Sequence, residues 1–133
     1  MKLNLKGYIF SRNFMGERVP QHVQNIIIKD YCDKNNFNYL LSATEYVMKN
    51  SYSMLKKIID DLDSYDGIVF YSLFQLPEKN TLRQEKLSTI LKKNKIIAFA
   101  CERIIVESYE SVKRIEDIWL IKKSIPKCKF IKI

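Results

Sequence analysis

The sequence predicts an α/β fold with a short parallel sheet covered by helices on both faces. Strand-like and helix-like segments alternate along the chain with short links, which is typical of right-handed βαβ crossovers in three layers. Residues 66–72 form a nearly continuous apolar run, and such runs are typical of strands buried on both faces of a parallel sheet. A length of 133 residues fits a single domain over residues 1–133.

The first half of the chain is expected to contain two strands and two helices. Residues 7–10 are apolar β-formers, and a polar loop over 11–19 separates them from a helix over 20–35. Pro20 suits the first turn of that helix, where no backbone N–H is needed. A strand is predicted over 37–41. Apolar residues at helical spacing then predict a helix over 51–62.

The second half repeats the alternation. After the strand over 66–72, Pro77 and Glu78 open a helix that carries Leu82, Leu87 and Ile90, and residues 95–101 form a fourth strand. Residues 103–106 could add a short edge strand, and residues 110–122 are predicted to be helical. The tail after Pro126 could add a weak strand or fray.

Composition limits the class of protein. No apolar run is long enough to span a membrane and no signal peptide is recognisable, so we expect a cytoplasmic protein without membrane insertion. The three cysteines form neither a disulfide framework nor a zinc spacing. With 3 glycines and no phosphate-binding loop motif, we expect no cofactor and no metal. The net charge of +8 comes mainly from lysine, and it favours solubility over a nucleic-acid partner.

Polar residues follow the predicted strands, where ligands bind in open parallel sheets. They are expected either to form a site or to be ordinary polar loop residues. The candidate ligand-binding residues at the strand ends are Arg12, Thr44, Ser72, Gln75 and Glu102.

The start of the first helix sharpens this prediction. The expected N-cap is Val19, which has no capping oxygen. The free N–H groups near Arg18 and His22, with Arg12 close by, could therefore hold a phosphate or carboxylate, and Arg18 and Gln21 are further candidate ligand-binding residues. Alternatively, water, Glu17 or Gln21 itself satisfies this helix end.

Three residues are candidates for catalysis. His22 is the single histidine and Glu45 a candidate general base, and either could move a proton. Ser11 could be a nucleophile if a base lies within reach. Each of the three could equally have a purely structural role.

Two stretches and one helix residue resemble the catalytic domain of resolvase-type serine recombinases. They are Gly7-Tyr8-Ile9-Phe10-Ser11-Arg12, Gln21, and residues 66–77 from Asp66-Gly67-Ile68 to Gln75-Leu76-Pro77. The resemblance implies a flavodoxin-like sheet of four parallel strands in the order 2-1-3-4, with an antiparallel edge as an option. The chemistry does not carry over. Phe10 stands where the family has an arginine, Ser11 and Arg12 are out of register with the family's serine, and Glu78 replaces a further arginine.

Longer stretches are similar to the bacterial sporadic carbohydrate cluster protein family. They are Gly7 to Arg12, Phe14 to Asn25, Tyr39 to Tyr46, and Asp66 to Pro77. That family's genes lie in surface-polysaccharide and O-antigen (lipopolysaccharide) clusters. The resemblance implies a role in carbohydrate biosynthesis, acting on a sugar phosphate, an acidic sugar or a nucleotide sugar, and leaves the reaction open among isomerase, epimerase, hydrolase and lyase chemistry.

Two alternatives remain at this stage. One is a non-catalytic accessory module that docks on a partner enzyme and forms a homodimer. The other is a recombinase-derived DNA binder without recombinase activity.

Overall fold

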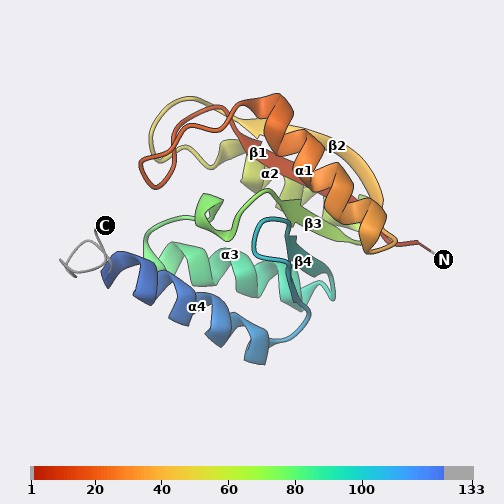
Figure 1. Ribbon diagram of the computed structural model, residues 1–133. Helices are drawn as coiled ribbons and strands as arrows, with labels where there is room; N and C mark the ends of the chain where they lie inside the picture. Colours follow the sequence, from red (N-terminus) through yellow and green to blue (C-terminus); the bar gives the residue numbers. More distant parts are fainter. Residues whose placement is uncertain (1, 125–133) are drawn as a thin grey trace.

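The computed structural model describes residues 2–124, which form three layers around one five-stranded sheet (Figure 1). The strand order is β2-β1-β3-β4-β5. The first four strands are parallel and β5 is antiparallel to β4. The predicted order and the antiparallel edge strand are therefore confirmed.

The elements occur in the predicted alternation. They are β1 (Asn4–Phe10), α1 (Gln21–Lys34), β2 (Asn38–Glu45), α2 (Ser53–Asp60), η1 (Leu62–Ser64), β3 (Gly67–Phe70), η2 (Leu73–Gln75), α3 (Asn80–Lys92), β4 (Ile96–Phe99), β5 (Ile104–Val106) and α4 (Tyr109–Ser124). The short helices η1 and η2 are 3₁₀ turns at either end of β3. The predicted weak strand after Pro126 lies outside the described residues.

The two faces of the sheet are covered unequally, and the side-chain alternation of the strands explains the two cores. On one face, Leu5 and Ile9 of β1 pack with Ile28 and Cys32 of α1. The other face carries the larger core, to which α2, α3 and α4 all contribute. One helix thus covers one face, and three helices cover the other.

Three local expectations need correction. The third helix, α3, begins at Asn80 and not at Pro77 and Glu78, because the 3₁₀ turn η2 and an extended Leu76 come first. β2 continues to Glu45, because residues 43–45 pair with β1, so Thr44 and Glu45 belong to a strand. The N-cap of α1 is Pro20, and Val19 lies one residue outside the helix. The loop after β1 contains a tight turn in which Phe14 and Glu17 exchange backbone hydrogen bonds of 3.0 Å. Met15 and Gly16 at the turn have positive φ angles of 53° and 75°.

Gly67 at the start of β3 is required by close packing against β4. A Cβ atom at this position would lie 2.3 Å from the backbone oxygen of Ile96 and 2.7 Å from its Cγ1 atom. We expect Gly67→Ala to lower the free energy of unfolding by about 2–3 kcal/mol, because the pairing of two buried strands must shift. Urea denaturation followed by circular dichroism measures the loss.

Gly16→Ala is the matched control. Its Cβ would meet nothing within 4 Å, so only the positive φ opposes the change, at a cost of about 1 kcal/mol. If both variants lost the same free energy of unfolding, the contact between the new Cβ atom and the Ile96 carbonyl would not be the cause of the Gly67→Ala effect.

Candidate functional site

Two adjoining hollows open beyond the carboxyl ends of the parallel strands. The inner hollow has a volume of about 350 Å³, and its lining includes Phe10, Arg12, Phe14, Val47, Lys49 and Phe74. The outer hollow measures about 540 Å³ and is lined by Pro77, Lys79, Leu82 and Lys123. Asn50, Tyr52 and Glu78 line both hollows, so we treat the two as one carboxyl-end groove.

Arg12 is the best-positioned charged group of the inner hollow. The centre of its guanidinium lies 4.1 Å from the ring centroid of Phe10 and 5.2 Å from that of Tyr52, so two aromatic rings hold its plane. Its Nη1 atom donates to the carbonyls of Tyr46 at 2.9 Å and Met48 at 3.3 Å. The guanidinium also forms a hydrogen bond with the Tyr52 hydroxyl. Within residues 2–124 neither Nε nor Nη2 donates to a carbonyl or a carboxylate, so N–H donors of these two atoms are available to a ligand.

The groove is strongly cationic. Arg12, Lys49, Lys79 and Lys123 line it, against the single carboxylate of Glu78. The ammonium of Lys123 donates to the backbone oxygen of Glu78 at 3.0 Å, which places this charge at the outer wall. Such a surplus of positive charge in a concave site attracts anions.

Tyr52 lines both hollows. Burial raises the pKa of its hydroxyl, and the nearby charge of Arg12 partly offsets that increase. The hydroxyl is therefore protonated at neutral pH and can donate to a ligand oxygen.

Glu45 has a structural role beneath the groove. Its side chain is 1% exposed, and its oxygens accept hydrogen bonds from the Tyr8 hydroxyl at 2.9 Å and from the N–H groups of Met54 at 3.0 Å and Leu55 at 3.2 Å. Those N–H groups lie in the first turn of α2, so a carboxylate from β2 caps a helix that has no side-chain cap of its own. Burial, followed by the charge of Glu45, raises the pKa of Tyr8 far above its usual range.

Ser11 is also tied to this structural region. Its hydroxyl donates to the backbone oxygen of Glu45 at 2.6 Å, and no histidine, lysine or carboxylate partner accompanies it in the described chain. The arrangement expected of an activated nucleophile is therefore not formed.

Ser72, Gln75 and Glu102 hold the turn after β3. The Glu102 carboxylate accepts from the Ser72 hydroxyl at 2.8 Å and from the N–H of Leu73 at 2.9 Å. Gln75 is fully buried and donates to Gln24 at 2.8 Å; its Oε1 atom has no partner among the described residues. These side chains line neither hollow, so the predicted convergence of all strand-end residues on one crevice is not observed.

Arg18, Gln21 and His22 are exposed at the start of α1, and Thr44 is half-buried in β2. The N-cap Pro20 makes no side-chain hydrogen bond, as a proline must, so the helix end is open as predicted. None of these residues lines the carboxyl-end groove. Their binding or catalytic roles therefore stay predictions without support from a shared cavity.

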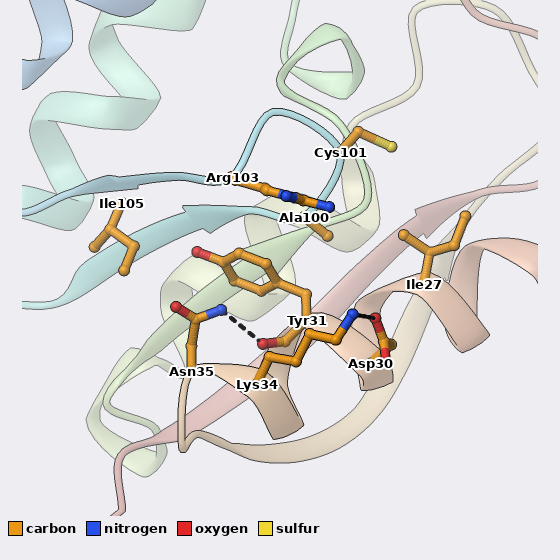
Figure 2. Close-up of a pocket in the computed structure, with 9 residues that line it drawn as sticks. All are labelled: Ile27, Asp30, Tyr31, Lys34, Asn35, Ala100, Cys101, Arg103 and Ile105. Atoms are coloured by element: carbon orange, nitrogen blue, oxygen red, sulfur yellow. Dashed lines mark hydrogen bonds and ion pairs between the residues drawn. The ribbon is translucent and has the colours of Figure 1, made fainter.

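A third hollow, of about 520 Å³, lies on the face of the sheet that α1 covers, between α1 and the β4–β5 connection (Figure 2). Its charged pair is already satisfied, because Lys34 lies 3.0 Å from Asp30. Cys101 stands at the rim with its sulfur directed away from Tyr31, and burial raises the pKa of its thiol. A protonated thiol is a poor nucleophile, so this hollow offers less chemistry than the groove.

Arg83 is 1% exposed, and no local sequence pattern marked it as a buried residue beside the groove. Its five N–H donors are all used: Nε and Nη2 donate to Glu116 at 2.8 and 2.6 Å, Nη1 to the carbonyls of Pro77 and Glu78 at 3.0 Å each, and Nη2 to Asn80 at 2.8 Å. This network fixes the segment that carries Glu78, and so it shapes the outer hollow.

Lys49, Lys79 and Lys123 were also missed as groove residues. They lie far apart in a lysine-rich sequence, and no local spacing distinguishes them from other surface lysines. Only the folded chain brings them together with Arg12.

Residues 2–124 contain neither a metal-binding cluster nor a membrane-spanning helix. No cluster of three or more histidine, cysteine or acidic side chains is placed to hold a metal ion in this range. Likewise, none of its helices combines the length and apolar character needed to cross a bilayer.

The order of the sheet, its antiparallel edge and its unequal helical layers define a resolvase-like α/β fold. A crystal structure of a resolvase family site-specific recombinase from Streptococcus pneumoniae is similar over 96% of this chain and 94% of that one, with a TM-score of 0.63 and 8% identity. The N-terminal catalytic domain of TP901-1 integrase is similar over 92% of this chain and 94% of that one, with a TM-score of 0.59 and 16% identity.

At these identities the likeness concerns the fold alone. No family model matches the sequence, and no curated protein matches it either. Any function must therefore be argued from the groove itself.

Proposed function

We propose that the carboxyl-end groove binds an anionic sugar, namely a sugar phosphate, an acidic sugar or a nucleotide-activated sugar, in the biosynthesis of a bacterial surface carbohydrate. The observation that carries this proposal is Arg12, whose guanidinium lies against two aromatic rings, while its Nε and Nη2 atoms donate to no carbonyl or carboxylate of residues 2–124. A guanidinium held in this way is suited to phosphate or carboxylate oxygens.

The remainder of the groove suits the sugar. Asn50, the Tyr52 hydroxyl and Glu78 line both hollows and offer donors and acceptors for sugar hydroxyls. Lys79 and Lys123 add charge for a second anionic group. The similarity of the strand-end stretches to the sporadic carbohydrate cluster family supports the biosynthetic setting.

Binding can be tested by isothermal titration with glucose 1-phosphate, UDP-N-acetylglucosamine, N-acetylneuraminic acid and inorganic phosphate. We expect Arg12→Met to weaken the binding of the preferred compound roughly tenfold or more, because charge-assisted hydrogen bonds are lost. Lys79→Met, which removes an exposed charge, should weaken it roughly three- to tenfold.

Lys29→Met is the matched control, since Lys29 is exposed on α1 away from the groove. Equal affinity in the wild type, Arg12→Met and Lys79→Met would contradict the proposal. Capture of a partner enzyme without binding of any of the four compounds would instead support the accessory-module alternative.

A further inference from the structure

The loop between β2 and α2 presents three successive apolar side chains to solvent. Tyr46, Val47 and Met48 are 52%, 68% and 64% exposed. We call residues 46–48 the apolar loop. Single exposed apolar residues are common on proteins, but three in a row at the mouth of a groove indicate a contact surface.

The backbone around the apolar loop keeps these side chains outward. The carbonyls of Tyr46 and Met48 accept hydrogen bonds from Arg12, and the N–H of Tyr46 donates to the buried carboxylate of Glu45 at 3.0 Å. The N–H of Ser51 also donates to the carbonyl of Met48 at 3.1 Å. Because the polar groups of the backbone are bound on the inner side, the apolar side chains are left on the outer side.

Positive charge surrounds this loop. The exposed Lys49 follows it directly, and Val47 and Lys49 both line the inner hollow beside Arg12. The loop, the turn after β1 and the last turn of α4 lie on the same side of the molecule (Figure 1). That last turn carries Lys122 and Lys123. The four cations that line the groove face a single carboxylate.

We propose that this side of the molecule docks on the surface of a bilayer that contains anionic lipids. The apolar loop enters the interface between headgroups and acyl chains, and the surrounding lysines pair with the headgroups. A projecting tip of three apolar side chains with a positive surround fits this partner better than a flat protein surface, since a stable protein interface needs about 800 Å² on each side. The inference goes beyond the proposed function and does not depend on which ligand the groove binds.

Co-sedimentation with vesicles tests the proposal on the full chain. We expect binding to vesicles of phosphatidylethanolamine and phosphatidylglycerol in equal parts, weaker binding as salt is raised, and little binding to phosphatidylcholine alone. Val47→Asp should reduce the partition coefficient about tenfold or more, because an ionised carboxylate would have to enter the interface. Lys49→Ala should reduce it roughly fivefold.

Ile26→Asp is the matched control, because Ile26 is 63% exposed and lies on α1, outside the loop. Circular dichroism establishes that each variant folds. Binding of Val47→Asp at the wild-type level, or equal binding to anionic and neutral vesicles, would overturn the proposal. It would also be overturned if the wild type bound to neither kind of vesicle. In that case, a dimer seen by light scattering that Val47→Asp abolishes would identify the loop as a protein contact.

Discussion

Replacement of Arg83 by methionine is expected to lower the free energy of unfolding by about 3–5 kcal/mol, the cost of breaking a buried ion pair on one side. Glu116 would lose two hydrogen bonds, and the ring of Trp119 would lose a guanidinium whose centre lies 4.6 Å from its centroid. The pair joins α3 to α4, so the loss should appear in urea denaturation followed by the fluorescence of Trp119, the single tryptophan.

Acid titration checks that the ion pair causes the effect. Burial by itself would raise the pKa of Glu116, but hydrogen bonds from Arg83 and Gln84 outweigh it and lower that pKa below its usual range. A lowered pKa in the folded state gives stability that is present above the unfolded pKa and is lost as pH falls through the folded pKa. Arg83→Met should therefore weaken the acid dependence of stability.

Arg114→Met provides the control for charge and length, because Arg114 is exposed on the same helix as Glu116. Its effect should stay within about 0.5 kcal/mol. A similar small effect for Arg83→Met, with an unchanged acid dependence, would show that the buried network does not stabilise the fold.

Glu45→Gln is expected to lower the free energy of unfolding by about 3 kcal/mol. The carboxylate of Glu45 is buried and accepts from the first turn of α2 and from the hydroxyls of Tyr8 and Ser51. An amide keeps one acceptor oxygen and turns the other position into a donor that faces donors, so several buried N–H and O–H groups lose their partner. Urea denaturation at neutral pH measures the change.

Ser51→Ala serves as the comparison, since it removes one of these hydrogen bonds, of 3.1 Å, and leaves the carboxylate in place. Its cost should be about 1 kcal/mol. If Glu45→Gln kept the stability of the wild type and lost only ligand conversion, the structural assignment would be wrong and the predicted role of Glu45 as a general base would stand.

The fold could be predicted from the sequence because its signals are local. Strand β3 is a continuous apolar run, α2 has apolar residues at helical spacing, and Pro20 marks the start of α1. The end of β2 was predicted too early, because Thr44 and Glu45 are polar residues that do not read as a strand. Their strand conformation comes from pairing with Ile9 and Phe10 of β1. A polar residue in a strand is recognised only when its buried partner is known.

The candidate site could be predicted in part. The carboxyl edge of the sheet and Arg12 were expected, since ligands bind at this edge in open parallel sheets. The roles of Glu45, Ser72 and Glu102 were not, because a polar residue after a strand can point into a groove or tie down a neighbouring turn. Here all three accept or donate hydrogen bonds within the protein.

The sequence by itself determined the alternation of strands and helices, the parallel character of the central strands, and the position of the edge where Arg12 lies. These features depend on periodicity and on local backbone preferences, which are properties of neighbouring residues. Only the tertiary structure decided that Lys49, Lys79 and Lys123 share a groove with Arg12, and that Glu45 and Arg83 are buried. Charge and burial of this kind arise between segments distant in the chain, so no local pattern contains them.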